Sequence, residues 1–415
     1  MDQAALATRL AFYRAVTWGL AVSGDRLTRL TAPPWRADPY RTYADLRSGP
    51  AVYRSRAGMA VVSTHELCHQ VLRDRRFGVR TTDGTLPEPF TATPLPTDHP
   101  ATPTFLERDP PDHSRLRALA RPAFGPGRIE GYRASVVKTT TRLLDAATAK
   151  PRFDLIADFA APLPIAVISD LMGIPDVDAA RFTHYGRVLG GALDGVRTLR
   201  HARALRTATS SLREMFTALI DRRRETPGED VISTLATADL SADDLIATCE
   251  LLLIAGFETT TNLIANAAWT LARHPDVWER MREEPEITPA VVEEVLRYEP
   301  PVQMTQRVPH EDVDLAGHRL RKDTFVVVLM ASAGRDPAAF TSPETFDPDR
   351  TDEKDHLAFS SGIHYCLGAP LARMEADVAL RALATRLPNL KITGKPKWRP
   401  TTVIRGLRNL RLQTL

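Results

Sequence analysis

One cysteine lies in a short glycine-bounded loop near the C-terminus, residues 359–368. The apolar run that follows, residues 371–383, predicts a helix, so Cys366 lies near a helix N-terminus, where a thiolate is favoured. Gly362 and Gly368 allow the backbone to pass close to whatever the sulfur contacts. The loop suits a flat cofactor packed against it. These features alone fit either a metal ligand or a nucleophile.

A second polar group lies inside a long apolar run, residues 241–273, which predicts a buried helix beginning at Ser241. Inside a helix Gly256 costs about 1 kcal/mol relative to alanine, and a buried Glu258 carboxylate is costly as well. A local opening at Gly256 would admit a small ligand, with Glu258 and Thr259 relaying protons to it. The alternative is a kinked core helix with a hydrogen-bonded glutamate.

Two further charged pairs have helical spacing. Asp109 is a candidate N-cap, and four residues separate His113 from Arg117, so one helix face could grip an anion. The alternative is a solvated basic face. Glu294 and Arg297 stand three apart and could form an ion pair.

The pattern His65-Glu66-x-x-His69 competes for a metal. On a helix it places two imidazoles on one face for zinc and leaves the glutamate as a base. The sequence offers no third ligand at a nearby downstream spacing. An ordinary surface helix with solvated histidines is therefore the favoured interpretation.

Composition limits the class of protein. The chain has 415 residues, 54 Lys and Arg against 51 Asp and Glu, and a net charge of +3, which predicts no nucleic-acid partner. Three widely spaced cysteines argue against a disulfide framework. The apolar run in residues 15–22 is too short to span a bilayer, and its spacing predicts an amphipathic helix on the protein's own surface. We expect a soluble cytoplasmic protein without a membrane span.

The remaining pattern predicts a mainly α fold with a minor β region. Strand-like runs occur at residues 51–62 and 325–329, and residues 401–415 predict a closing hairpin. We expect a helical extension over residues 1–34, a single domain over residues 35–415, and a loop at residues 86–105. Long helices are predicted at residues 129–147, 161–172, 178–193 and 199–225.

Five stretches in the same order resemble the cytochrome P-450 family, in particular its soluble bacterial members: residues 109–117, 255–260, 294–297, 346–350 and 359–368. The resemblance implies a fold that holds haem b between the long central helix and the Cys366 loop. The sequence departs from the family pattern at Ser360, where the family often has glycine, and at Gly334, where it often has asparagine.

By resemblance, each candidate residue acquires a role. Cys366 would be the thiolate ligand of the haem iron, Phe359 would pack beside it, and Gly362 and Gly368 would also contact the cofactor. The propionate-binding residues would be His113, Arg117, Arg307 and His364. The oxygen-binding groove and proton relay would be Ala255, Gly256, Glu258 and Thr259. A structural ion network would join Glu294, Arg297 and Arg350. The substrate pocket would be lined by Val302, Gln303, Met304 and the loop at residues 86–105.

The implied reaction is insertion of one oxygen atom from O2 into an apolar small molecule, by hydroxylation or epoxidation. Family habit suggests a polyketide, macrolide or terpenoid intermediate. The chain has no dinucleotide fingerprint and no spare cysteines for an iron–sulfur cluster, so a separate ferredoxin and its reductase would supply electrons, docking near Arg115, Arg121 and Arg373. Two other classes stay open: a zinc hydrolase built on His65, Glu66 and His69, and a non-catalytic haem or lipophile carrier.

Overall fold

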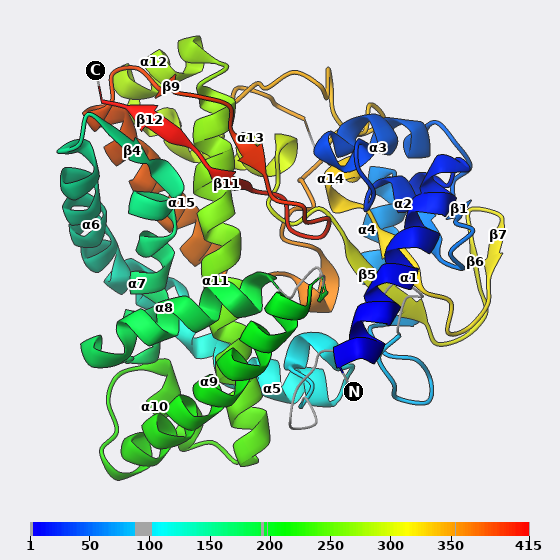
Figure 1. Cartoon of the computed structure of the whole chain (residues 1–415), viewed down its shortest axis with the longest axis horizontal. Coiled ribbons are helices and arrows are strands. Elements are labelled where there is room, and N and C mark those ends of the chain that lie inside the picture. Colours follow the sequence, from blue (N-terminus) through cyan, green and yellow to red (C-terminus); the bar gives the residue numbers. More distant parts are fainter. Residues whose placement is uncertain (1–2, 88–101, 192–194, 197, 353, 415) are drawn as a thin grey trace.

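The structure is a computed structural model and describes residues 3–87, 102–191, 195–196, 198–352 and 354–414. A large helical part and a smaller part that contains the main sheet lie side by side (Figure 1). The prediction of a mainly α fold with a minor β region is confirmed.

Helix α11 (Ala242–Leu271) runs through the middle of the helical part (Figure 1). Ser241 caps it by accepting a hydrogen bond from the Asp244 amide, as its sequence position predicts. Most of its side chains are buried, because other helices surround it. These helices are α7 (Pro162–Met172), α8 (Asp176–Gly190), α9 (Leu199–Glu225), α13 (Thr288–Tyr298) and α15 (Ala369–Arg386).

The outer helices complete this part of the molecule, and α6 packs against α15. They are α5 (Asp112–Ala120), α6 (Pro126–Thr148), α10 (Val231–Ala236) and α12 (Pro275–Glu283). Short 3-10 turns are η1 (Trp35–Ala37), η2 (Phe105–Glu107), η3 (Arg121–Phe124), η6 (Pro285–Ile287) and η7 (Gly362–His364), and η4 (Ile156–Ala160) is a π-helix.

The main sheet has the strand order β1-β2-β8-β5-β3. Its strands are β1 (Tyr53–Arg54), β2 (Ala60–Val62), β3 (Phe77–Gly78), β5 (Thr305–Pro309) and β8 (Val326–Val328). The strand-like run predicted at residues 51–62 forms the antiparallel pair of β1 and β2. The helices α3 (Pro39–Arg47), α4 (His65–Arg73) and α14 (Met330–Ala333) lie beside this sheet, and β6 (Val313–Leu315) pairs with β7 (His318–Leu320).

The C-terminal strands do not form the predicted hairpin. β11 (Leu407–Asn409) pairs with β10 (Lys397–Trp398), whereas β12 (Arg411–Gln413) lies between β4 (Arg152–Asp154) and β9 (Lys391–Ile392). The hairpin prediction is wrong because both strands find partners elsewhere in the chain.

The N-terminal residues form α1 (Gln3–Val22) and α2 (Arg26–Arg29). Leu6 and Leu10 of α1 belong to the same hydrophobic core cluster as the central helices. The boundary after residue 34 stays a prediction. No helix in the described ranges is long and apolar enough to cross a membrane.

Candidate active site

The Cys366 loop is held by its own backbone. The Cys366 amide donates to the Phe359 carbonyl oxygen at 2.9 Å, which closes the loop directly before α15. Gly362 has φ +69°, and a Cβ there would lie 2.5 Å from the Leu72 carbonyl oxygen of α4. This position therefore requires glycine, both for its left-handed conformation and for the close approach of α4.

Two opposing influences act on the Cys366 thiol. Burial is the larger and raises its pKa, while the Gly368 and Ala369 amides and the Arg117 and Arg373 guanidinium groups lower it. The helix N-terminus thus favours the thiolate, as expected, but does not outweigh burial. A metal ion bound to the sulfur would add a further positive charge that favours the thiolate.

Four cationic or imidazole side chains gather beside this loop: His113 and Arg117 from α5, Arg307 from β5 and His364 from η7. The rings of His113 and His364 lie 4.3 Å apart between centroids. No ring nitrogen of either histidine has a hydrogen-bond partner in the described part of the chain, and neither does Arg307 Nη2. The four groups lack a described carboxylate as ion-pair partner.

Burial makes this cluster costly. It lowers the pKa of His364 to about 2, with the charges of Arg307, His113 and Arg117 adding to the effect, and it lowers the pKa of Arg307 to about 10. Buried polar groups are normally hydrogen-bonded. Unsatisfied donors that converge beside a thiol fit a flat ligand with carboxylates on one edge, and the propionates of haem meet that requirement.

Helix α11 presents a different kind of surface. Ala255 is exposed and Gly256 and Thr259 are half-buried, although their neighbours Phe257 and Glu258 are buried in the middle of the molecule. The Thr259 hydroxyl donates to the Ala255 carbonyl oxygen at 2.7 Å. Open space therefore borders this turn of the helix, and the Thr259 hydroxyl lies at its edge.

The opening of α11 predicted at Gly256 does not occur, since the helix is continuous from Ala242 to Leu271. A Cβ on Gly256 would lie 3.0 Å from Ile168 Cδ1 of α7. The glycine allows α11 and α7 to pack closely. This packing explains the glycine without any break in α11.

Glu258 has partners that the sequence did not indicate. Its carboxylate forms an ion pair with Arg399, which lies next to β10 near the C-terminus, and accepts a hydrogen bond from Asn262 Nδ2 at 3.3 Å. Asn262 stands four residues along α11, so helical spacing could have indicated it. Nothing in the sequence links Arg399 to Glu258.

Glu294 joins two arginines in a buried network. Its carboxylate pairs with Arg297 at 2.7 Å and with Arg350 at 3.0 Å. Arg297 also donates to the carbonyl oxygens of Gly334, Pro343 and Thr345. The network ties α13 to the irregular segment that leads into the Cys366 loop.

A second buried charge cluster was missed in the sequence. Glu299 accepts from Arg405 Nε at 2.5 Å and from the Tyr40 hydroxyl at 3.0 Å, and the Arg335 guanidinium lies 3.6 Å from the Tyr40 ring centroid. The cluster joins α3, the end of α13 and the C-terminal segment. Its members are far apart in the chain, so no local spacing could indicate them.

The expected substrate-lining residues have different surroundings. Gln303 is buried, accepts from the Tyr43 hydroxyl at 3.0 Å and donates to the Pro300 carbonyl oxygen at 2.7 Å. Met304 packs in a core cluster with residues of α2 and α3. The side chains of Gln303 and Met304 are thus buried in the protein interior, whereas Val302 is only half-buried. Within the expected loop, residues 88–101 lie outside the described residues.

The zinc alternative has no complete ligand set. His65 Nε2 lies 2.8 Å from the Asp355 carbonyl oxygen, and the His65 and His69 rings are stacked 6.1 Å apart. Within the described ranges, no group of three or more His, Cys, Asp or Glu side chains could hold a metal ion.

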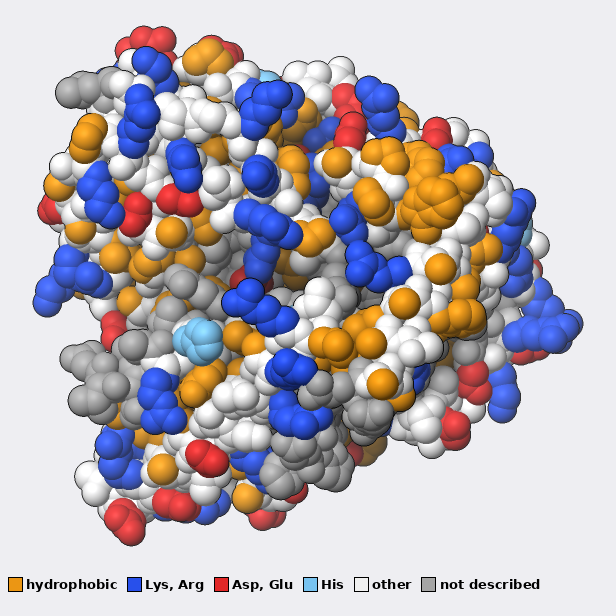
Figure 2. All heavy atoms as spheres, in the orientation of Figure 1, with side chains coloured by type: hydrophobic (Ala, Val, Ile, Leu, Met, Phe, Trp, Pro, Cys, Tyr) orange, Lys and Arg blue, Asp and Glu red, His pale blue; other side chains and the backbone are white. Residues whose placement is uncertain are grey.

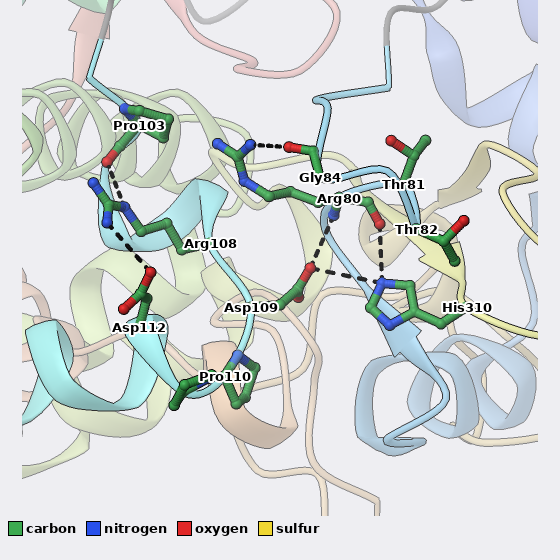
Figure 3. Close-up of a pocket in the computed structure, with 11 residues that line it drawn as sticks. Arg80, Thr81, Thr82, Gly84, Pro103, Arg108, Asp109, Pro110, Asp112 and His310 are labelled. Carbon is green, nitrogen blue, oxygen red and sulfur yellow. Dashed lines mark hydrogen bonds and ion pairs between the residues drawn. The ribbon is translucent and has the colours of Figure 1, made fainter.

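A cavity of about 630 Å³ lies beside the start of α5 (Figure 3). Asp109 accepts from the Val79 and Arg80 amides at 2.9 and 3.1 Å, so it does not cap α5 as predicted. Arg108 pairs with Asp112 at 3.6 Å, and His310 lies 3.7 Å from Asp109. In Figure 3 Arg108 and His310 thus lie beside carboxylates, whereas the Arg80 guanidinium donates to the backbone carbonyl oxygens of Gly84 and Glu107. This cavity contains none of the cluster beside Cys366.

The chain is similar to known proteins of one family. A family model described as Cytochrome P450 matches residues 196–388. The cytochrome P450 monooxygenase PikC of Streptomyces venezuelae is 39% identical over 390 residues, covering 90% of each chain. The polyketide biosynthesis cytochrome P450 PksS of Bacillus subtilis is 37% identical over 315 residues, 74% of this chain and 76% of that one.

A solved structure of similar fold is also a cytochrome P450. CYP164A2 of Mycobacterium smegmatis has a TM-score of 0.83 and 39% identity, over 94% of this chain and 99% of the other. The family, the fold and the monooxygenase class expected from the sequence are confirmed, and the family implies a haem cofactor. The chain belongs to the cytochrome P450 family of monooxygenases.

Proposed function

We propose that this chain binds haem b through Cys366 and oxidises an apolar natural-product intermediate with electrons from a ferredoxin. The observation that carries the proposal is the cluster of buried, unsatisfied donors beside a single thiol. Haem, when bound, supplies the activation of O2 and the insertion of one oxygen atom into the substrate.

The protein would hold the cofactor at its propionates and at its iron. Arg117 and Arg307 would neutralise the two propionates, and the ring nitrogens of His113 and His364 would donate to them. The Cys366 thiolate would ligate the iron. The Glu294–Arg297–Arg350 network would hold the segment that enters the Cys366 loop in place.

Proton delivery would be the task of α11. The Thr259 hydroxyl is positioned at the open space beside Ala255 and would hold and pass on a proton there. Glu258 is engaged by Arg399 and Asn262. It would have to turn away from these partners before it could supply a proton to Thr259.

The substrate class is proposed from the relatives. One of them is named for polyketide biosynthesis. Hydroxylation or epoxidation of a polyketide, macrolide or terpenoid intermediate fits an active site bordered by the apolar side chain of Ala255, and Val302 would add to the apolar lining. The pocket roles of Gln303 and Met304 have less support, since both side chains are used in core packing.

A ferredoxin, itself reduced by a ferredoxin reductase, would dock beside the Cys366 loop. Ile363 and Tyr365 are exposed there, and Arg121 is an exposed cation at the end of α5. Arg373 is already paired with Glu293 at 2.6 Å, so it contributes less free charge than the sequence suggested. The three cysteines are free, which suits the reducing cytoplasm.

Spectroscopy of the purified protein tests the ligand assignment. The ferrous carbonyl complex should show the strongly red-shifted band of thiolate ligation, and Cys366→His should abolish it. Cys249→Ser is the matched control, because this thiol is buried in α11 away from the loop. Persistence of the band in Cys366→His would show that the ligand is another residue.

Turnover separates an enzyme from a haem carrier. Candidate substrates are screened by their effect on the haem spin state, and those that respond are incubated with ferredoxin, reductase, NADPH and labelled O2. A product carrying one labelled oxygen atom is expected. Haem binding without turnover of any responding compound would favour the carrier.

A further inference from the structure

Lys and Arg side chains are spread over the face of the molecule shown in Figure 2, so a cation at the surface does not by itself indicate a function. The guanidinium group of Arg373 in α15, however, is held in one place beside the Cys366 loop. Its Cζ atom lies 4.6 Å from the centroid of the Phe359 ring, and its Nη1 atom donates to the Tyr365 hydroxyl at 3.2 Å. The Phe359 carbonyl oxygen in turn accepts from the Cys366 amide. A positive charge therefore lies against the loop that presents the thiol.

Glu293 of α13 binds this guanidinium group through both of its carboxylate oxygens. Oε1 accepts from Arg373 Nε at 2.6 Å and Oε2 accepts from Arg373 Nη2 at 2.9 Å. Two parallel hydrogen bonds fix the plane of the guanidinium group as well as its position. Burial raises the pKa of the Glu293 carboxyl, but hydrogen bonds from Arg373 and His356 outweigh burial and lower this pKa to about 2. Glu293 is therefore charged at neutral pH, and its pair with Arg373 is neutral as a whole.

His356 holds the same carboxylate. Its Nε2 atom lies 3.1 Å from Glu293 Oε2, and its Nδ1 atom accepts from the Ala358 amide at 3.2 Å. Because Nδ1 must keep a lone pair to accept, Nε2 carries the ring proton and donates to Glu293. His356 thus fixes the carboxylate without adding a charge.

Stability accounts poorly for this arrangement. The side chains of Glu293 and Arg373 are 43% and 34% exposed. Ion pairs with this much exposure contribute little to the free energy of unfolding, because water and salt screen them. The neighbouring Glu294, by contrast, is buried with its arginines and holds the segment that enters the Cys366 loop. A role for the exposed pair in the chemistry of the loop is therefore the better explanation.

We propose that Glu293 and His356 are positioning residues for the Arg373 guanidinium group, and that the charge balance between Glu293 and Arg373 sets the reduction potential of the cofactor at Cys366. This inference rests on the proposed ligation of haem by Cys366. The reduction potential of an iron site depends on the charges and hydrogen bonds around its ligands. Reduction adds a negative charge, so a positive charge beside the loop favours it and a negative charge opposes it.

The two partners predict shifts of opposite sign. Glu293→Gln leaves Arg373 unbalanced, so the potential should rise, whereas Arg373→Gln leaves Glu293 unbalanced, so the potential should fall. At a fixed applied potential, each change should alter the ratio of ferrous to ferric protein by about threefold or more. The double variant Glu293→Gln/Arg373→Gln should lie close to the parent, because both charges are gone.

His356 is tested by a pair of variants. His356→Leu removes the hydrogen bond to Glu293, so the carboxylate is free to turn toward solvent, and the potential should rise by part of the shift seen in Glu293→Gln. His356→Gln still has a side-chain amide that can donate and should restore the parent's potential. Equal potentials of His356→Leu and the parent would remove the positioning role from His356.

Redox titration of the full chain with haem bound, with small mediators and without ferredoxin, measures these potentials independently of ferredoxin docking. Arg373→Lys keeps the charge and should stay closer to the parent than Arg373→Gln. Arg381→Gln is the matched control, because Arg381 pairs with Asp377 at 2.6 Å on the same helix. It lies about 12 Å farther along α15 than Arg373 and should leave the potential unchanged.

The red-shifted band of the ferrous carbonyl complex reports whether Cys366 ligates the iron. Its absence in the parent would overturn the haem proposal and this inference with it. If the parent has the band, shifts of the same sign in Glu293→Gln and Arg373→Gln, or no shift in either, would overturn this inference alone. Loss of the band in both variants would do the same, because the pair would then hold the loop in place without tuning its charge.

Discussion

Thr259 and Thr260 are neighbours on α11 with opposite surroundings. Both hydroxyls donate to the carbonyl oxygen four residues earlier, but Thr260 is buried and Thr259 faces the open space. Thr259→Ala should therefore raise the hydrogen peroxide formed per NADPH consumed, by about tenfold or more, because a positioned proton donor is lost. Thr260→Ala should leave this ratio unchanged, and an equal effect of both variants would remove the assigned role from Thr259.

Ser360 carries backbone strain. Its φ is +63°, a left-handed conformation in which a Cβ costs roughly 1–2 kcal/mol. Its Oγ is buried and has no hydrogen-bond partner among the described residues. Ser360→Gly should raise the free energy of unfolding by about 1 kcal/mol in chemical denaturation. Ser361→Gly is the control: Ser361 has an extended backbone at φ −152°, so glycine there should only add flexibility.

Glu375 couples stability to pH. Burial in α15 raises the pKa of its carboxyl well above the ordinary 4.5, so the folded protein keeps a proton that the unfolded chain releases. Stability from this group is complete below pH 4.5 and falls as pH rises above it. Glu375→Gln should therefore flatten the decline of stability as the pH rises above 4.5. The exposed Glu279→Gln should keep the parent's slope.

At the scale of elements, Gly334 determines how closely α14 approaches α13. A Cβ there would lie 2.5 Å from the Arg297 carbonyl oxygen, while the Gly334 carbonyl itself accepts from Arg297 Nη1 at 2.7 Å. The departure from asparagine at this position thus has a steric reason.

Gly334→Ala should lower the free energy of unfolding by about 2 kcal/mol or more, because it separates the helices and loosens the Glu294–Arg297 pair. Gly131→Ala in α6 has open space around its Cβ and should instead stabilise by about 0.5–1 kcal/mol. Chemical denaturation measures both, and a neutral Gly334→Ala would show that the contact relaxes freely.

The sequence predicted the elements better than their partners. The bounds of α9, residues 199–225, and the start of α11 were predicted correctly, because periodicity and capping are local. The C-terminal hairpin and the Asp109 cap were wrong, since the true partners lie far away in the chain. In the site, the three-residue spacing of Glu294 and Arg297 indicated their ion pair. The ion pair of Glu258 with Arg399 depends on tertiary packing, so the sequence did not indicate it.

At the scale of the whole molecule, the cofactor pocket and the stability of the fold are linked. Arg307 is buried with one guanidinium nitrogen unsatisfied, and burial lowers its pKa to about 10. Arg307→Gln should raise the melting temperature of the haem-free protein, because it removes a buried charge that Asp109 offsets only in part. The same change should speed haem loss from the loaded protein.

Arg297→Gln is the comparison, since Arg297 has Glu294 as its partner and its loss should destabilise both forms. Thermal unfolding with and without haem, and transfer of haem to apomyoglobin, measure the two effects. A lower melting temperature of haem-free Arg307→Gln would show that another described group already balances this charge.

The position of β12 in its sheet affects the order of events during synthesis. Both neighbours of β12 are made before it, and Leu410 donates its amide to Asp154, 256 residues earlier in the chain. A ribosome that has not yet released residue 411 therefore holds β4 with an unpaired edge, which is a hazard for mispairing. A nascent chain of this protein therefore exposes the unpaired β4 until residues 411–413 have been translated and released.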